Sequence, residues 1–387
     1  MRSSIDSKLP DVGTTIFTVM SQLALDTGAI NLSQGYPSFD PPDKLVQRIC
    51  NHLQNGANQY APMAGVPALR QAIAEKTQRL QRRAIDPDDE ITVCCGATEG
   101  LFSAIQAIVR RGDEVIVLDP AYDSYEPAVT LAGGITRHCP MAIEPNGFDF
   151  AVDWQQLGDC INDKTRLIVL NFPHNPTGAI LTEADLERLA ELVRNNDCYL
   201  LSDEVYEHIV FDGQRHRSLL SHDELWERSL VISSFGKSVH ATGWKIGYCM
   251  APKALSAEFR KVHQFVTFAI STPVQCGIAD FLAEHGDFLD SLSEFYQRKR
   301  DLFCNLLEGS RFRLKPARGT FFQIVDYGEI DDEPDIDIAK RWTRDIGVAS
   351  IPISVFCRDP YTGNRLRFCF AKDDATLEAA ASRLREL

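Results

Sequence analysis

The chain has 387 residues, of which 44% are hydrophobic and 24% are charged, and its formal net charge at pH 7 is −14. This length predicts two or three domains with a substantial buried core, and the composition is that of an ordinary globular protein. The acidic excess argues against a general affinity for nucleic acid or for an anionic membrane surface.

Eleven cysteines are scattered along the chain without the spacing of a zinc site or of a small disulfide framework. We therefore expect reduced thiols, no metal site and a cytoplasmic protein. Residues 1–13 are polar and lack the apolar core of a signal peptide. No run approaches the roughly 18 apolar residues of a membrane span, so we expect no membrane partner.

The first predicted element is a helix over residues 16–32, which we expect to pack with the C-terminal part of the chain. Short β-rich runs then alternate with helical patterns. The predicted helices are residues 98–111, which stop at Gly112, and a helix opened by a capping box at Thr182 and running to about residue 194. The predicted strands are residues 114–119, 166–171, 198–202 and 229–233.

The apolar strands are nearly continuous, which suits strands that are covered on both faces. Their alternation with helices predicts an α/β fold with a mostly parallel sheet flanked by helices. From about residue 276 to residue 307 one long helical stretch leads to a smaller α+β domain, with strands expected over residues 321–325 and 367–371. We assign residues 42–282 to the large domain and residues 1–41 and 283–387 to the small one.

Four short stretches carry most of the functional signal. They are Asn175–Gly178, Ser202–Tyr206, Ser233–Lys237 and Arg365–Arg367. Their order and spacing resemble those of pyridoxal-phosphate (PLP) aminotransferases of fold type I, and residues 234–247 resemble the lysine segment of class I members. The resemblance runs from residue 31 to residue 367. It is greatest to the branch that contains the methionine aminotransferases and the kynurenine/glutamine transaminases, including at residues 58–63 and 352–357.

This resemblance implies a role for each of four residues toward PLP. Lys237 would hold the aldehyde as a Schiff base and then serve as the acid–base group. Asp203 follows a predicted strand, where ligands of parallel sheets bind, and would keep a proton on the pyridine nitrogen. Tyr206 and Asn175 would flank the ring's phenolic oxygen. Read singly, Lys237 fits a surface lysine, Asp203 fits a helix N-cap and Asn175 fits a turn residue before Pro176.

A phosphate site is predicted where a helix begins, near residue 96, because backbone N–H groups and the helix dipole favour an anion there. The residues assigned to it are Gly96, Ala97, Thr98, Ser234 and Lys245. The resemblance also implies that Tyr122 stacks on the ring. It implies that Tyr60 reaches the phosphate of a neighbouring subunit, which would require a homodimer with shared active sites.

On the substrate side, Arg367 matches the arginine that binds the substrate α-carboxylate, with Asn175 and the Gly35 backbone beside it. Arg365 is the alternative, because strand alternation places both arginines on one side of the sheet. Residues 262–297 contain no Arg or Lys, although aspartate-type enzymes have their second arginine in that region. An apolar and aromatic side-chain pocket is expected instead, formed by Phe17, Tyr36, Tyr122 and Phe356.

The sequence therefore predicts a transaminase that moves the amino group of methionine or of an aromatic or large apolar L-amino acid to a 2-oxo acid. A kynurenine transaminase or a cysteine-S-conjugate β-lyase on the same scaffold is the nearest alternative. A PLP-binding regulator fused to a DNA-binding domain is disfavoured, because the residues before Gln34 show no basic helix-turn-helix.

Overall fold

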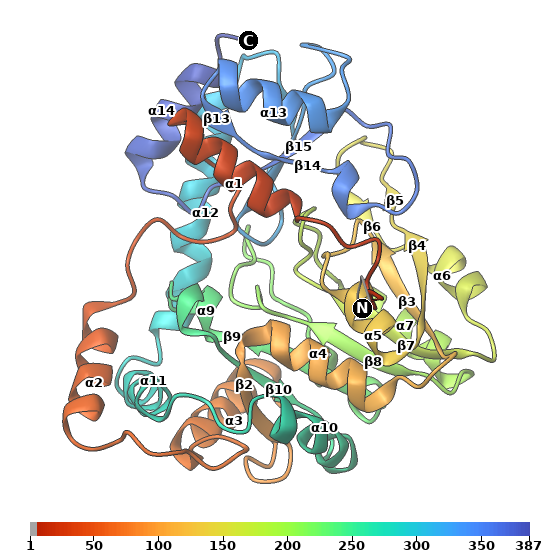
Figure 1. Ribbon diagram of the computed structural model, residues 1–387, viewed down its shortest axis with the longest axis vertical. Helices are drawn as coiled ribbons and strands as arrows, with labels where there is room; N and C mark the ends of the chain where they lie inside the picture. Colours follow the sequence, from red (N-terminus) through yellow and green to blue (C-terminus); the bar gives the residue numbers. More distant parts are fainter. Residues whose placement is uncertain (1–5) are drawn as a thin grey trace, which may run out of the picture.

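The computed structural model describes residues 6–387, and its centre is a seven-stranded sheet (Figure 1). Strand β10 runs antiparallel to both of its neighbours, and the other neighbouring strands run parallel, so the prediction of a mostly parallel sheet is confirmed. The strand order is β2 (Ile91–Cys95), β10 (Ile246–Met250), β9 (Ser229–Ser234), β8 (Tyr199–Asp203), β7 (Thr165–Asn171), β3 (Glu114–Asp119) and β4 (Ile135–Pro140).

Helices cover both faces of this sheet because its central strands bury both sets of alternating side chains. In β3, Val115 and Val117 pack toward one face, and Ile116 and Leu118 pack toward the other. The first face is covered by α4 (Gly96–Ile108), α5 (Tyr125–Ala132) and α10 (Lys253–Val266). The second is covered by α2 (Asp43–Gln54), α3 (Pro67–Gln81), α6 (Trp154–Cys160), α7 (Glu183–Arg194), α8 (Asp223–Trp226) and α11 (Thr272–Glu284).

A separate apolar cluster lies around a four-stranded sheet of β11 (Arg313–Leu314), β12 (Phe322–Asp326), β15 (Arg365–Cys369) and β14 (Ile351–Pro352). The helices around it are α1 (Ile16–Thr27), α12 (Phe288–Leu307), α13 (Asp335–Asp345) and α14 (Asp374–Leu384). Figure 1 shows α1 beside α13, as expected for an N-terminal helix that packs with the C-terminal part. Strand β1 (Ile30–Asn31) pairs with β13 (Val348–Ala349).

The remaining elements are short. They are β5 (Ala142–Ile143), β6 (Phe150–Ala151), α9 (Phe235–Ser238) and the 3₁₀ turns η1 (Leu219–Ser221), η2 (Thr242–Trp244) and η3 (Ser354–Phe356). The proposed domain boundaries stay a prediction, and residues 1–5 of the small domain lie outside the described residues. Within the described part of the chain, no helix has the length and apolar character needed to cross a membrane.

Most predicted elements are confirmed within a few residues, and the capping box at Thr182 opens α7 as expected. Two helix predictions are wrong. The single helix over residues 276–307 is interrupted between α11 and α12 at residues 285–287, where Gly286 disfavours a continuous helix. The helix over residues 16–32 ends at Thr27, because Gly28 adopts the left-handed conformation (φ 65°) that terminates helices.

Candidate active site

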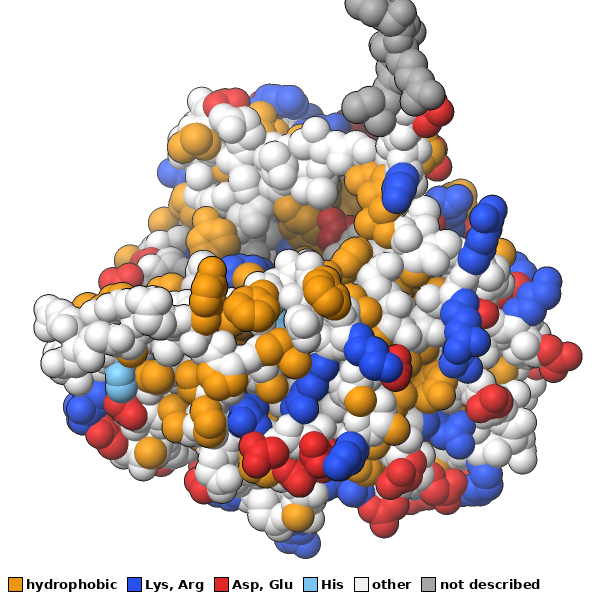
Figure 2. All heavy atoms as spheres, turned by 60° about the horizontal axis from the view of Figure 1, so that its bottom comes forward, with side chains coloured by type: hydrophobic (Ala, Val, Ile, Leu, Met, Phe, Trp, Pro, Cys, Tyr) orange, Lys and Arg blue, Asp and Glu red, His pale blue; other side chains and the backbone are white. Residues whose placement is uncertain are grey.

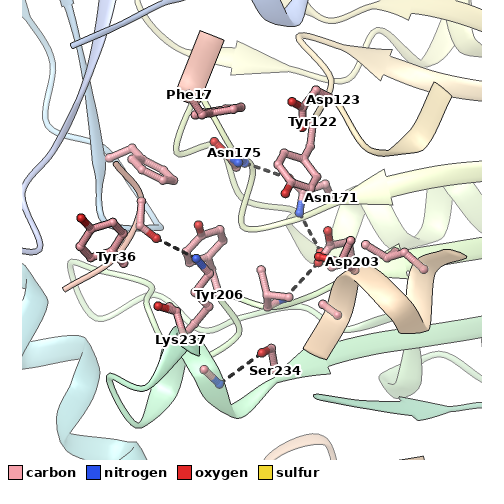
Figure 3. Close-up of a pocket in the computed structure, with 18 of the residues that line it drawn as sticks. Phe17, Tyr36, Tyr122, Asp123, Asn171, Asn175, Asp203, Tyr206, Ser234 and Lys237 are labelled. Carbon is pink, nitrogen blue, oxygen red and sulfur yellow. Dashed lines mark hydrogen bonds between the residues drawn. The ribbon is translucent and has the colours of Figure 1, made fainter. Parts of the chain in front are cut away.

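A cavity of about 500 Å³ lies where β7, β8 and β9 reach their carboxyl ends and α4 begins (Figure 3). Segments near both ends of the chain complete its walls. The cavity brings together most of the predicted site residues, namely Phe17, Gly35, Tyr36, Ala97, Thr98, Tyr122, Asn175, Asp203, Tyr206, Ser234, Lys237, Lys245 and Arg367. Side chains that are far apart in the sequence therefore face one space.

Lys237 lies on α9, directly after β9, and its side chain projects into the cavity. Its Nζ atom donates a hydrogen bond of 2.8 Å to the Gly35 carbonyl oxygen. The same atom lies 5.6 Å from the centre of the Tyr206 ring and 5.4 Å from that of Phe321. Burial lowers the pKa of Lys237 to about 8, because a poorly solvated site disfavours the charged amine. A much larger fraction of this amine is therefore neutral and nucleophilic near neutral pH than for an exposed lysine.

Asp203 ends β8 and is only 4% exposed. The Tyr125 hydroxyl donates to its Oδ2 atom at 2.8 Å, and the Val205 N–H donates weakly to Oδ1 at 3.4 Å. Burial raises the pKa of Asp203 to about 6, and the Tyr125 hydrogen bond works in the opposite direction. The carboxylate thus lies at the floor of the cavity with capacity to accept a further hydrogen bond.

Asn171, the last residue of β7, joins two of the predicted residues. Its side-chain amide donates to the Asp203 carbonyl at 2.9 Å, and its Oδ1 accepts the Asn175 N–H at 2.9 Å. Neither Asn171 nor Tyr125 was among the predicted site residues. Asn171 could have been found, because it is a polar residue at the end of a buried strand. Tyr125 reaches Asp203 only through the packing of α5.

The start of α4 forms a tight cradle with the loop before β10. Gly96 has a φ of 68°, and a Cβ atom there would lie 3.1 Å from Lys245 Nζ. A Cβ on Gly247 would lie 2.7 Å from the Gly96 carbonyl carbon. Ala97 and Thr98 line the cavity, whereas Gly96 itself is buried beneath it. The helix N-terminus and the lysine therefore face the same small space.

Arg367 is 1% exposed and is held from two sides. One terminal nitrogen donates to Asn175 Oδ1 at 2.6 Å, and the other donates to the Ser33 carbonyl at 3.0 Å. Its guanidinium carbon lies 3.9 Å from the centre of the Phe322 ring, and its Nε has no hydrogen-bond partner among the described residues. Burial lowers the pKa of Arg367 to about 10, which leaves it charged at neutral pH.

The alternative arginine does not reach the cavity. Arg365 donates to the Gly147 carbonyl, and its guanidinium lies 5.5 Å from the centre of the Phe150 ring. It is absent from the residues that line the cavity, so the two arginines of β15 differ in surroundings although they share one side of the strand. Arg367 is the arginine that can meet a ligand there.

Two predicted residues lie elsewhere. Phe356 does not line the cavity: it packs edge-on behind Phe17, with ring centres 5.9 Å apart, and faces a neighbouring hollow. Tyr60 is 83% exposed and packs against Phe268, so it contributes nothing to the cavity of its own chain. Lining residues that the sequence did not point to are Thr15, Gln34, Leu101, Asp123, Asn171, Val205, Gly236, Thr242 and Phe322.

The sequence matches proteins of known function. Residues 27–384 match the family model described as aminotransferase class I and II. The chain is 50% identical to the methionine aminotransferase of Escherichia coli K12 over 98% of both chains, and 34% identical to kynurenine–oxoglutarate transaminase 1 of Rattus norvegicus over 98% of this chain and 97% of that protein.

Solved structures give the same result. The structure of YbdL from Escherichia coli, described as having a methionine aminotransferase function, matches with a TM-score of 0.96 and 49% identity over 99% of this chain and 100% of that chain. An aspartate aminotransferase double mutant from Thermus thermophilus matches with a TM-score of 0.90 and 30% identity over the whole of both chains. The chain has the fold type I architecture of these enzymes, and it is an aminotransferase of the class I and II family.

Proposed function

We propose that this aminotransferase uses PLP to move the amino group of methionine, or of an aromatic or large apolar L-amino acid, to a 2-oxo acid. The observation that carries the proposal is that a lysine with a lowered pKa, a buried carboxylate and a buried arginine face one cavity, at Lys237, Asp203 and Arg367. Each suits a different group, namely an aldehyde, a protonated ring nitrogen and a carboxylate.

The cavity fits PLP on its own features. The cradle between Gly96 and Lys245, which a side chain on Gly96 would fill, suits a phosphate group at a helix N-terminus. Thr98 and Ser234 lie at its edge. Tyr122 offers a ring face, and Asp203 can accept a hydrogen bond from a protonated ring nitrogen. When bound, PLP would supply an electron sink for negative charge on the substrate's α-carbon.

The chain's own residues perform the remaining tasks. Arg367 can bind the substrate α-carboxylate because a guanidinium offers five donors in a fixed fork. One terminal nitrogen already donates to Asn175 Oδ1, which fixes the orientation of the group. Lys237, whose pKa is about 8, can take the proton from the substrate's α-carbon and deliver it to a different carbon, as movement of the amino group requires. Tyr206 is buried beside Lys237 and can hold an anionic oxygen through its hydroxyl.

The substrate preference rests on the aromatic walls. Phe17, Tyr36 and Phe322 line the cavity, and Phe17 and Phe322 lie beside Arg367. Among the described residues, no lysine or arginine other than Lys237, Lys245 and Arg367 lines it. A wall of this kind favours a large apolar side chain over a second carboxylate. The identity of 50% to a methionine aminotransferase over almost the full length supports methionine within that class.

We also propose a homodimer in which Tyr60 contributes to the partner's site. Tyr60, which is 83% exposed, packs against the exposed Phe268, and exposed apolar regions mark protein contacts. Figure 2 shows hydrophobic side chains gathered along the rim of a hollow in the molecule. A cytoplasmic location is part of the proposal, because none of the eleven cysteines forms a disulfide.

The deciding experiment is the absorbance spectrum of the PLP-loaded protein before and after addition of L-methionine without an oxo acid. We expect the cofactor band to change and the matching oxo acid to appear in equal amount. A band unchanged by methionine but changed by kynurenine would place the chain with the kynurenine transaminases. Release of pyruvate from a cysteine conjugate without amino transfer would favour the β-lyase. Failure to bind PLP would overturn the proposal.

A further inference from the structure

A second group of charged side chains lies under the floor of the cavity and takes no part in the chemistry proposed above. The turn that follows β8 alternates in direction: Asp203 and Tyr206 line the cavity, whereas Glu204 and Glu207 do not. Both glutamates are largely buried and hydrogen-bonded on the other side. A buried carboxylate is costly unless it is paired, so these two carboxylates have a role that outweighs that cost.

Glu207 forms the larger of the two networks. Both of its carboxylate oxygens accept hydrogen bonds of 2.8 Å from Lys76 Nζ, which comes from α3, and the side chains are only 5% and 8% exposed. Its Oε1 also accepts from the Tyr248 hydroxyl at 2.6 Å and from Ser233 Oγ at 2.5 Å. Lys76, the neighbouring His208 and the Ser233 hydroxyl hold the pKa of Glu207 far below its usual range despite its burial, so the carboxylate is ionised.

The partners of Glu207 come from α3, β9 and β10, of which β9 leads directly to Lys237 in the cavity. Ser233 precedes Ser234 at the end of β9, and α9 with Lys237 follows directly. Tyr248 follows Gly247 on β10, which packs against the start of α4. Glu207 itself is one residue after Tyr206. One carboxylate thus joins the turn after β8, the end of β9, β10 and helix α3.

Glu204 forms a smaller clamp on the same turn. It accepts hydrogen bonds from Ser202 Oγ at 2.8 Å and from the Leu219 N–H at 3.2 Å, and its other oxygen lies 2.7 Å from His216 Nε2. The turn is also closed by a backbone hydrogen bond from the Glu207 N–H to the Glu204 carbonyl. Glu204 therefore fixes the turn to its own strand and to residues 216–219, whereas Glu207 fixes it to the neighbouring strands.

We propose that Lys76 and Glu207 are positioning residues: their buried ion pair, shared with Ser233 and Tyr248, holds the turn after β8 and the end of β9 in register. Asp203, Tyr206 and Lys237 thereby keep their orientation toward the cavity. The proposal rests on the PLP-dependent function given above. It assigns to Lys76 and Glu207 no contact with cofactor or substrate.

The test compares Glu207→Gln with Glu114→Gln in the PLP-loaded protein. Glu114 is an equally buried carboxylate of the same sheet, paired with Arg137, but it begins β3, at the end of the sheet away from the cavity. We expect Glu207→Gln to lower kcat by about 10- to 100-fold, since a displacement of 1 Å in a reacting group costs on the order of 100-fold. KM should change by less than kcat. The pH midpoint at which the cofactor absorbance band changes should shift in Glu207→Gln. In Glu114→Gln this midpoint and kcat should stay unchanged.

Two further variants separate positioning from stability. Ser233→Ala removes one hydrogen bond and leaves the ion pair, so it should fold, shift the spectral midpoint and lower kcat by a smaller factor. The double variant Lys76→Met with Glu207→Leu leaves no unpaired charge and should recover thermal stability but not kcat. Lys76→Arg, which keeps the charge, should have part of the activity that the double variant lacks.

Either of two results would overturn the proposal. One is a double variant that folds and has the parent's kcat and spectral midpoint. The other is a pair of outcomes observed together. The Ser233→Ala protein would have the parent's spectrum and kinetics, and the Glu207→Gln protein would lose only thermal stability. These results differ from failure of the proposed function, which would appear in the unmodified protein as an inability to bind PLP or to respond to an amino acid.

Discussion

The two halves of the cavity are built in different ways. The cofactor half is made of polar side chains at the ends of neighbouring strands, with Asp203 and Asn171 tied together by hydrogen bonds. The substrate half is made of aromatic rings from separate segments, and Tyr36 there is 47% exposed. In the proposed mechanism the sheet therefore positions the reacting groups, whereas the choice of substrate depends on how peripheral segments dock.

Replacing the lysine of the cofactor half has the largest expected effect. Lys237→Ala should lower transamination by at least about 10²- to 10⁴-fold, the usual contribution of a positioned acid–base group, because no other amine takes its place. Steady-state kinetics with methionine and a 2-oxo acid measures this. Lys253→Ala, at a surface lysine paired with Asp89, is the control and should be silent. Full activity of Lys237→Ala would refute the assignment.

The arginine at the junction of the two halves should come next. Arg367→Lys loses the fork geometry, and hydrogen bonds to a charged group contribute about 1.5 to 3 kcal/mol. We expect kcat/KM for methionine to fall by about 10- to 100-fold, mostly through KM. PLP binding, measured by absorbance, should be retained. Arg365→Lys, on the same strand but outside the cavity, should change kcat/KM little; equal losses in both variants would contradict the distinction.

A pH experiment addresses the cofactor half alone. Burial lowers the pKa of Lys237 from 10.5 to about 8, and only the neutral amine can bond to an aldehyde. The amine is protonated below this pKa, so the rate at which cofactor-free protein takes up PLP should rise with pH and level off above pH 8. Stopped-flow absorbance measures the rate. An uptake rate that keeps rising toward pH 10 would show that the lysine titrates like an exposed one.

The smallest effect is expected in the substrate half. Phe17→Leu removes ring area beside Arg367 but leaves Phe356 behind it to fill part of the space. We expect the ratio of kcat/KM for methionine to that for alanine to fall by less than about tenfold, near the lower end of the roughly 1 to 3 kcal/mol that one methylene contributes in an apolar pocket. Competition kinetics measures the ratio. A loss equal to that of Arg367→Lys would contradict the division of tasks between the halves.

The same division explains what could be predicted from the sequence. The strands β3, β7, β8 and β9 were found because each is a nearly continuous apolar run. Strand β10 was missed: its residues include Gly247 and Cys249, and its antiparallel insertion between β2 and β9 has no local signal. The edge strand β4 was missed because its exposed and covered residues alternate and it ends in a proline.

For the site, motifs predicted the residues that face the cavity but not those that support them. Asp203 and Lys237 stand in recognisable segments, whereas Tyr125 and Lys76 reach the site only through helix packing, which local patterns do not encode. The position of Phe356 could not be predicted for the same reason: its ring centre lies 5.3 Å from the Arg367 guanidinium and its ring packs against Phe17, which lies more than 300 residues earlier.

The hydrogen bond from Arg367 to the Ser33 carbonyl, which joins residues 334 positions apart, has a consequence for synthesis of the chain. Contacts this distant form late, because a long loop must close before they stabilise anything. A ribosome that has made the large sheet but not β15 has produced the strand ends that would hold PLP and no arginine for the amino acid. The growing chain thus forms the proposed cofactor site before it can bind a substrate.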